Sequence, residues 1–315
     1  MTKFYYGSIN KKRSSPRIIT IGNFDGVHLG HQTILRFCIN EAKKNNIISS
    51  VITFHPHPKV FFNSTPPQEA IHTLRDKATE ISKLNIDEIF FIPFNLKLSK
   101  ISPTNFIKEL LIDKLNMKII VVGRDFKFGS NRSGDIELLK KLSNDYGFKP
   151  IVFENINSEN QRISSTRLRY FAKIGLFSQI IKSRGENLVI RGRVIHGKKL
   201  GRTLDYPTLN IKVPKNLCFS GIFGVMVSGV DKSNKTKKLP GVASLGKRPT
   251  IERDGNLILE VYILDWNKEI YGNLVNIEIV DKIRDEKKFE SLDDLKKQMI
   301  IDETTVREKI FLNEQ

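Results

Sequence analysis

The stretch TIGNFDGVHLGH, residues 20–31, combines residue types that could act on a phosphate, and it runs from an apolar segment into a helical pattern. Gly22 and Gly26 would let the backbone approach a ligand closely, and a helix N-terminus offers unpaired amide groups and a positive dipole. His28 and His31 are three residues apart, on the same side of such a helix. Together these groups could hold the charge that develops on a nucleotide phosphate during displacement. The alternative is a glycine-rich turn with incidental histidines, which the coincidence of so many special residues disfavours.

A second stretch, GRVIHGKKLGRTLDYPTLNI at residues 192–211, places glycines around a basic turn and then starts a strand pattern at Pro207. Thr208 and Asn210 are two apart, so a strand sends both side chains to one face. There a hydroxyl and an amide oxygen could hold magnesium and ATP phosphates. A polar strand face turned to water has the same spacing, and spacing alone leaves both interpretations open.

The elements around the first stretch follow the pattern of a parallel α/β sheet. Apolar runs alternate with amphipathic stretches, which predicts a Rossmann-like layout with helices on both faces of the sheet. The expected strands are 17–21, 50–54, 88–94, 118–122 and 149–153, and the expected helices are 33–44, 74–84, 103–115 and 135–146.

After about residue 178 closely spaced strand patterns replace this alternation. Turn signals between them favour a small antiparallel β-barrel, closed by a C-terminal helix from about Leu292. The boundary is expected near Arg184, which gives domains at residues 1–183 and 184–315. The expected strands of the second domain are 188–195, 208–213, 222–230, 257–264 and 274–280.

Composition narrows the class of protein. The 315 residues are enough for two compact domains, and a net charge of +18 would attract nucleic acid or phosphorylated small molecules, although a compositional bias has the same effect. The apolar runs are too short to span a membrane and the start has no signal-peptide pattern, which predicts a cytoplasmic protein. Cys38 and Cys218 lie in different halves without a CxxC partner, so we expect buried free thiols.

The longer string GNFDGVHLGH resembles the FMN adenylyltransferase branch of the HxGH nucleotidyltransferases. Three further segments match that branch in order, and the resemblance covers most of residues 18–170. They are TFHPHP at 53–58, GRDFKFGSNRSGD at 123–135 and ISSTRLR at 163–169. The resemblance implies an α/β Rossmann-like nucleotidyltransferase domain that transfers an adenylyl group from ATP to FMN.

The resemblance also implies roles for single residues. His28, His31 and Arg167 would stabilise the charged transition state. The expected ATP-binding residues are Gly22, Phe24, Asp25, Gly26, Ser165 and Thr166. The expected flavin-binding residues are His57, Asp125 and Phe128.

Each segment also has a physical interpretation of its own. Ser165 and Thr166 can cap the helix that follows, and Arg167 adds charge for a polyphosphate; an ordinary cap with solvated arginines is the alternative. Asp125 follows a strand at its carboxyl end, where open α/β sheets bind ligands. The neighbouring Phe126 and Phe128 could flank an isoalloxazine ring, or they could plug the core.

A zinc site is a further alternative, because His55 and His57 also follow a strand end and could join His28 and His31. Zinc would need a defined ligand set and supporting hydrogen bonds, whereas imidazoles aimed at phosphate need only reach it. The metal site is therefore disfavoured, and His55 is left without a role.

The second stretch resembles the riboflavin kinase signature GRxxGFPTANI, and the likeness continues through GVASLGKRPT, LEVYILDW and KIRDEKKFESLDDLKKQMIID, over most of residues 188–302. The resemblance implies that Gly197, Gly201, Thr208 and Asn210 bind magnesium and ATP. Arg284 would bind the flavin, in a small antiparallel β-barrel with a C-terminal helix.

Glu260 would be the base that takes the proton from the ribityl hydroxyl. It alternates with Leu259 and Val261, so it lies on the face opposite the apolar side chains, and a carboxylate suits that role. A solvent-facing strand glutamate is the alternative. The chain departs from the family pattern at Asp205, Tyr206, Leu209, Ser244 and Tyr262, and none of these changes removes a proposed catalytic group.

The two resemblances together imply FAD synthesis in two steps, with Mg²⁺ and ATP in each: riboflavin is phosphorylated to FMN, and FMN is then adenylylated. The expected partners are the small-molecule substrates, with no nucleic acid and no membrane, and the protein is expected to be a monomer or a weak homo-oligomer. Two rivals are a nucleotidyltransferase for another phosphate with a barrel that merely binds, and a basic nucleic-acid-binding or flavin-sensing protein. Residues 241–247 nearly spell a P-loop, but Arg248 and Pro249 stand where a Ser/Thr and a helix are needed.

Overall fold

The fold is seen in a computed structural model, which describes residues 1–62, 68–154, 157–158, 161–197, 206–231, 233–246, 257–268 and 270–312. By packing, the chain forms two compact units. Unit 1 is Met1–Gln68 with Lys77–Ser165, and unit 2 is Glu69–Asp76 with Thr166–Gln315. Among the described residues, no helix is long and apolar enough to cross a membrane.

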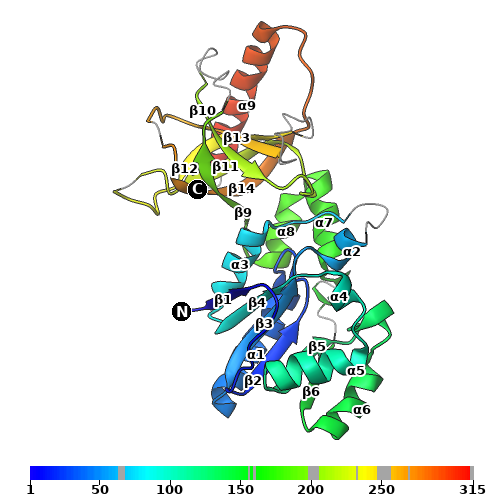
Figure 1. Cartoon of the computed structure of the whole chain (residues 1–315). Coiled ribbons are helices and arrows are strands. Elements are labelled where there is room, and N and C mark those ends of the chain that lie inside the picture. Colours follow the sequence, from blue (N-terminus) through cyan, green and yellow to red (C-terminus); the bar gives the residue numbers. More distant parts are fainter. Residues whose placement is uncertain are drawn as a thin grey trace. The chain divides into compact units, whose positions relative to one another are not determined.

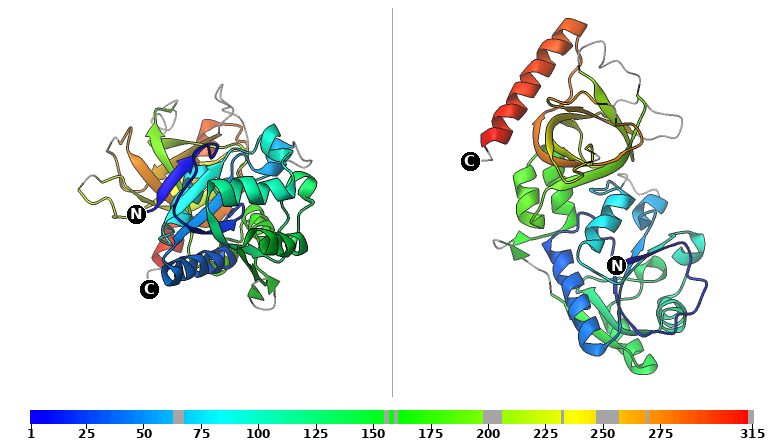
Figure 2. Two further views of the ribbon diagram at one scale, coloured as in Figure 1. Left: turned by 60° about the horizontal axis from the view of Figure 1, so that its bottom comes forward. Right: turned by 90° about the vertical axis from the view of Figure 1, so that its left-hand side faces the viewer.

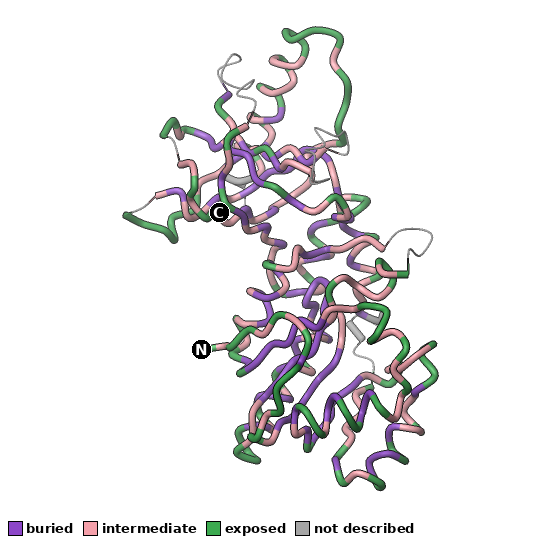
Figure 3. Tube along the Cα trace, viewed as in Figure 1, coloured by how far each residue is buried: buried purple, intermediate pink, exposed green. Residues whose placement is uncertain are grey.

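Unit 1 is built on a parallel sheet of six strands in the order β1-β4-β3-β2-β5-β6 (Figure 1). The strands are β1 (Lys3–Tyr6), β2 (Arg17–Ile21), β3 (Ile48–Phe54), β4 (Glu88–Ile92), β5 (Met117–Gly123) and β6 (Lys149–Phe153). Every residue of β2 and β4 is buried, as expected for parallel strands covered on both faces (Figure 3).

Helices follow the strands of this sheet. Helix α1 packs against β2, β3 and β5, and α6 packs against β6. The helices are α1 (Leu29–Asn45), α2 (Pro58–Phe61), α3 (Leu74–Ser82), α4 (Leu96–Ser99), α5 (Pro103–Asn105), the π-helical η1 (Phe106–Lys114), the single turn η2 (Ser130–Arg132) and α6 (Ile136–Tyr146). A two-stranded ribbon, β7 (Asn157–Ser158) with β8 (Gln161–Arg162), precedes the end of the unit.

The strand order has a switch point between β2 and β5. From β2 the chain proceeds outward through β3 and β4, and it then returns to place β5 and β6 on the other side. Open α/β sheets bind ligands outside the carboxyl ends of the strands at such a point. The turn after β2 and the loop after β5, the two segments singled out in the sequence, both leave the sheet there.

Unit 2 contains a closed antiparallel barrel in the order β10-β13-β12-β11-β14-β9 (Figure 2). Its strands are β9 (Leu188–Ile195), β10 (Thr208–Val213), β11 (Gly221–Ser228), β12 (Leu239–Leu245), β13 (Leu257–Ile263) and β14 (Leu274–Arg284). Helices α7 (Ser165–Ile174) and α8 (Phe177–Arg184) precede the barrel, and α9 (Leu292–Leu312) packs against β11, β12 and β14. Gly192 is required inside, because a Cβ there would lie 2.1 Å from the side chain of Ile211.

The segment Glu69–Asp76 packs with unit 2 although it precedes α3 in the sequence. The amide of Ala70 donates to the carbonyl of Asn216 at 2.8 Å. The amide of Cys218 donates to the carbonyl of Ala70 at 2.9 Å. The ring of His72 contacts the buried guanidinium of Arg184 at 2.7 Å. No sequence pattern predicted that this segment packs with unit 2, and the division of function at residues 183/184 stays a prediction.

The predicted fold class is confirmed: a parallel α/β sheet is followed by a closed barrel and a C-terminal helix. The strands expected at 17–21, 149–153, 188–195 and 208–213 have the predicted bounds. Strands β1, β7, β8 and β12 were missed. Cys38 and Cys218 are free and buried, as predicted, and burial raises the pKa of the Cys38 thiol to about 12.

Candidate active sites

The turn between β2 and α1 has an unusual backbone. Phe24 (φ 48°), Gly26 (φ 84°) and Val27 (φ 38°) all have positive φ, which L-residues with bulky side chains rarely adopt. The side chains of Phe24 and Val27 are each 2% exposed, so packing in the core holds the turn in this shape. Gly22 is closely covered, since a Cβ there would lie 3.1 Å from the Phe24 ring. Strained turns of this kind are typical of ligand-binding sites.

His28 is the N-cap of α1, and its Nδ1 accepts a hydrogen bond from the backbone N–H of His31 at 3.3 Å. Because Nδ1 is the acceptor, the proton of the neutral ring must be on Nε2. The rings of His28 and His31 stack with their centroids 3.7 Å apart. Burial, the neighbouring His28 and the charge of Lys77 together hold the pKa of His31 well below its ordinary value. His31 is therefore a neutral imidazole at neutral pH.

The ISSTRLR segment reaches the turn through Ser165. Its hydroxyl donates to the backbone carbonyl of Asp25 at 2.7 Å, across 140 residues of sequence. Asp25 itself is buried. Thr166 and Arg167 follow in α7 and belong to unit 2, where the Arg167 guanidinium lies 5.1 Å from the centre of the Phe171 ring. The structure thus brings Ser165 onto the predicted ATP-binding turn.

Unit 1 also holds an aromatic cavity of about 870 Å³. Six phenylalanines line it, with cationic side chains among the remaining residues of the wall. The phenylalanines are Phe54, Phe62, Phe94, Phe106, Phe126 and Phe128, and the cations are Lys59, Lys127 and Arg132. A flat apolar ring with an anionic tail suits such a wall.

The predicted flavin-binding residues take different places around this cavity. Phe128 is part of the wall, whereas His57 and Asp125 directly precede the wall residues Pro58 and Phe126. His57 caps α2, its Nδ1 accepting the Lys59 amide at 3.1 Å. Phe126 and Phe128 stack on each other with centroids 5.3 Å apart and both line the cavity. Their contact with a flavin ring stays a prediction.

In unit 2 the predicted kinase residues meet through strand pairing. Asn210 of β10 lies opposite Glu260 of β13, and Ser244 of β12 lies opposite the same glutamate. Directly opposed residues of paired strands point to the same face, so these side chains share one polar face with Thr208. Asn210 is buried against Gly197. A Cβ on Gly197 would lie 2.3 Å from the side-chain amide nitrogen of Asn210. The predicted residue Gly201 and the departure at Asp205 lie outside the described residues.

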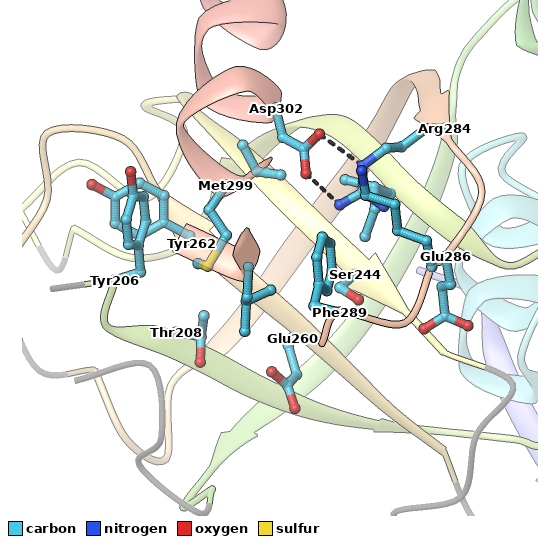
Figure 4. Close-up of a pocket in the computed structure, with 14 residues that line it drawn as sticks. Tyr206, Thr208, Ser244, Glu260, Tyr262, Arg284, Glu286, Phe289, Met299 and Asp302 are labelled. Carbon is cyan, nitrogen blue, oxygen red and sulfur yellow. Dashed lines mark hydrogen bonds and ion pairs between the residues drawn. The ribbon is translucent and has the colours of Figure 1, made fainter. Parts of the chain in front are cut away.

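A cavity of about 370 Å³ lies beside this face, between the barrel and α9 (Figure 4). Thr208, Ser244 and Glu260 line it, together with Tyr206 and Tyr262, two of the positions that depart from the family pattern. Figure 4 shows the Thr208 and Glu260 side chains pointing the same way from neighbouring strands. Hydroxyl and carboxylate groups are thereby placed together in the wall of this pocket.

Arg284 lies in the wall of this cavity and is held by Asp302 of α9 in a two-pronged ion pair, with N–O distances of 2.8 Å and 2.6 Å (Figure 4). Asp302 was missed in the sequence. A signal was present, because Leu295, Met299 and Asp302 follow the spacing of one helix face and all line the cavity. An acid in phase with apolar residues marks a buried carboxylate that needs a partner.

The fold, with one candidate site at the switch point of a Rossmann-like sheet and another on the polar face of a barrel, is that of a nucleotide-dependent transferase. A family model described as FAD synthetase matches residues 10–167, and one described as riboflavin kinase matches residues 184–310. Relatives named bifunctional riboflavin kinase/FMN adenylyltransferase are 38% identical in Buchnera aphidicola and 36% identical in Escherichia coli, each over 92% of both chains. A Haemophilus influenzae relative of the same name is 38% identical over 94% of both. The chain belongs to the family of bifunctional riboflavin kinase/FMN adenylyltransferases.

A solved structure agrees over nearly the whole chain. It is from Streptococcus pneumoniae and is described as a macrolide-efflux protein. The TM-score is 0.76 at 30% identity, and the match covers 95% of this chain and 96% of the other. The likeness supports the fold of both units, whereas the name of that protein differs from the names of the two families.

Proposed function

We propose that the two reactions of this family are divided between the two units, with adenylyl transfer at the turn after β2 and riboflavin phosphorylation on the polar face of the barrel. As a member of the family, the protein converts riboflavin to FMN and FMN to FAD, using one ATP in each step. The observation that carries the division is the cross-strand set of Thr208, Asn210 and Glu260 in unit 2, far along the chain from the capped histidine turn of unit 1.

In the first reaction Glu260 accepts the proton of the terminal ribityl hydroxyl while that oxygen attacks the γ-phosphate of ATP. The new O–P bond gives FMN, and ADP leaves. Thr208 and Asn210 are hard oxygen donors, and the close fit of Asn210 against Gly197 fixes its amide, so these residues fit a magnesium–ATP complex. Bound there, magnesium would neutralise charge on the phosphates. Arg284, fixed by Asp302, lines the pocket that would receive the flavin.

In the second reaction the FMN phosphate attacks the α-phosphate of another ATP, and pyrophosphate leaves without a covalent enzyme intermediate. The amide groups at the start of α1 and the Nε2–H of His28 are donors for the charge that builds up on the phosphate. Arg167 adds a full positive charge. The aromatic cavity of unit 1 would hold the isoalloxazine ring, with Phe128 in its wall.

Magnesium dependence, cytoplasmic location and a monomeric or weakly oligomeric state belong to the same proposal. Nucleic acid is not expected as a partner, because both sites are explained by small phosphorylated molecules. A gel shift that persists at physiological salt would contradict this.

The test is a time course with purified protein, riboflavin, ATP and magnesium, with flavins and nucleotides separated. FMN with ADP should appear first, followed by FAD with pyrophosphate, and supplying FMN in place of riboflavin should remove the lag. Chelating magnesium should stop both steps. A protein that forms FAD from FMN but never FMN from riboflavin would contradict the assignment of unit 2.

A further inference from the structure

Arg132 of unit 1 lies in a short loop that forms part of the wall of the aromatic cavity. Two backbone hydrogen bonds between Phe128 and Gly134, 3.1 Å and 2.9 Å long, close the base of this loop. At its other end the amide of Ser130 donates to the carbonyl of Ile101 at 2.7 Å, and η2 packs against α4. The loop is therefore held at both ends, and it presents Arg132 from a fixed position.

The backbone of this loop is strained at Arg132 itself. Asn131 and Arg132 both have left-handed backbones, with φ of 52° and 55°. Asparagine tolerates this conformation, whereas arginine rarely adopts it. Strain of this kind gathers at ligand-binding sites.

The charge of Arg132 has no evident structural use. The residue is exposed, and among the described residues no carboxylate forms an ion pair with it. Lys127 of the same wall, in contrast, pairs with Asp135 at 3.4 Å. An arginine that strains the backbone and faces a cavity without an ion pair indicates a binding role for which some stability is given up.

The cavity follows the carboxyl edge of the sheet. Ile21 is the last residue of β2, Phe54 is the last residue of β3, and Phe94 comes two residues after β4; all three line the cavity. These strands are neighbours in the order β4-β3-β2, so β2 and β4 lie two strand spacings apart, about 10 Å. Ile21 directly precedes Gly22 of the candidate phosphate-binding turn. Arg132 belongs to the opposite end, because η2 packs against α4, the helix that follows β4.

We propose that Arg132 binds the isoalloxazine ring of FMN at the end of the cavity remote from the phosphate, where its guanidinium donates to a carbonyl oxygen and an adjacent ring nitrogen. The inference rests on the proposed function of the turn and of the aromatic cavity. Because the FMN phosphate must reach the turn, the ring has to extend along the cavity toward α4. The hydrogen-bond acceptors of the ring system lie on its pyrimidine side, and the planar fork of an arginine matches two neighbouring acceptors. The apolar dimethylbenzene side is left to the phenylalanines of the wall.

The test uses lumiflavin, which has the same ring system with a methyl group in place of the ribityl phosphate, as a competitor of FMN. Lumiflavin has no hydroxyl for the kinase step, and its competition with supplied FMN for FAD formation reports on unit 1 alone. In full-length Arg132→Met, the KM for FMN and the inhibition constant of lumiflavin should both rise by about tenfold, the lower end of the range for losing a hydrogen bond to a charged group. The KM for ATP and riboflavin phosphorylation should be unchanged. Arg132→Lys should recover only part of the loss, because lysine lacks the fork.

Two further variants separate binding from a structural role. Arg124, an exposed arginine of the preceding segment, pairs with Glu154 at 3.0 Å, and Arg124→Met should match the wild type in both constants. Arg132→Asn suits the left-handed backbone, so it should unfold at the wild-type temperature or higher while the KM for FMN rises as in Arg132→Met. A lower unfolding temperature with a normal KM for FMN would overturn the proposal.

The outcomes also distinguish this inference from the function on which it rests. A raised KM for FMN with an unchanged lumiflavin constant would place Arg132 at the phosphate and overturn the proposal. If lumiflavin competes with FMN in the wild type and both constants stay the same in Arg132→Met, only the role of Arg132 fails. If lumiflavin does not compete in the wild type, or if His28→Asn is fully active in adenylyl transfer, the proposed function of unit 1 fails and the role of Arg132 with it.

Discussion

The two sites are assembled in different ways. The candidate phosphate-binding turn of unit 1 lies almost wholly within residues 22–31, and its shape comes from local backbone strain held by Phe24 and Val27. The polar face of unit 2 joins Asn210 and Glu260, which are fifty residues apart and meet only through the pairing of β10 with β13. One site is a property of a turn, and the other is a property of strand register.

This difference predicts different weaknesses. A shift of one residue between β10 and β13 would turn Glu260 to the opposite face and destroy the kinase site. The turn of unit 1 depends less on register, although hydrogen bonds from the hydroxyls of Ser165 and Thr53 join it to distant segments through the carbonyls of Asp25 and Asn23. Substitutions that remove one chemical group without disturbing its support should therefore separate the two activities cleanly.

The sharpest separation is expected from Glu260→Gln. The amide keeps the size of the side chain and its place on β13 but cannot accept the ribityl proton, so riboflavin phosphorylation should fall by about 10³-fold. Adenylyl transfer from supplied FMN should be unchanged, as measured by FAD formation. The exposed Glu308 of α9 offers a control, and Glu308→Gln should leave both rates intact. Equal loss of both activities in folded Glu260→Gln would remove the division between the units.

His28→Ala tests the other half of the comparison. Loss of the imidazole should lower adenylyl transfer by roughly 10²-fold or more and leave riboflavin phosphorylation nearly intact. Alanine also removes the N-cap of α1, which costs about 1 kcal/mol, whereas asparagine is a good N-cap. His28→Asn should therefore restore the unfolding temperature but not the rate. Recovery of the rate with asparagine would mean that the cap, and not the imidazole, matters.

Asp302→Asn tests whether the barrel site needs the ion pair that α9 makes with Arg284. Removing the carboxylate leaves the largely buried Arg284 unpaired, which should lower the free energy of unfolding by about 3 kcal/mol. The KM for riboflavin should rise by about tenfold while the KM for FMN in adenylyl transfer stays the same. Asp293→Asn, at the exposed start of the same helix, is the control. An unchanged KM for riboflavin would show that Arg284 needs no anchor.

The local site was also the more predictable one. Residues 22–31 carry the glycines and histidines that the structure places in the turn, and the mostly apolar sequences of β2 and β4 indicate the buried sheet. Strand β12 was missed because Pro240 and Gly241 interrupt its pattern, although its Ser244 lies opposite Glu260. Contacts between distant elements leave little local trace.

Two such contacts were not predicted from the sequence. Asp302 is defined by its partner Arg284 on another element, and the segment Glu69–Asp76 joins unit 2 through backbone hydrogen bonds that any sequence can form. The helical spacing of Asp302 indicates a buried carboxylate but does not identify its partner, and no pattern of polar and apolar residues indicates the contact of the segment. The predicted roles of Thr208, Asn210 and Glu260 came from the family resemblance, whereas their meeting on one face follows from register.

The smallest expected effect concerns pH. The pKa of His31 in the folded protein lies well below its ordinary value, so the unfolded chain binds this proton more readily. The neutral ring thus contributes stability that is fully present above about pH 6.5, the ordinary value for histidine, and is lost as the pH falls through the lower folded pKa. In calorimetry from pH 8 to 5, the unfolding temperature of the wild type should fall by more than that of His31→Asn, and the two curves should run parallel only above neutrality. The described residues around Glu260 include no such imidazole pair. If the unfolding temperatures of the wild type and His31→Asn differ through the unfolding of unit 2 instead, the assignment of pH sensitivity to the turn is wrong.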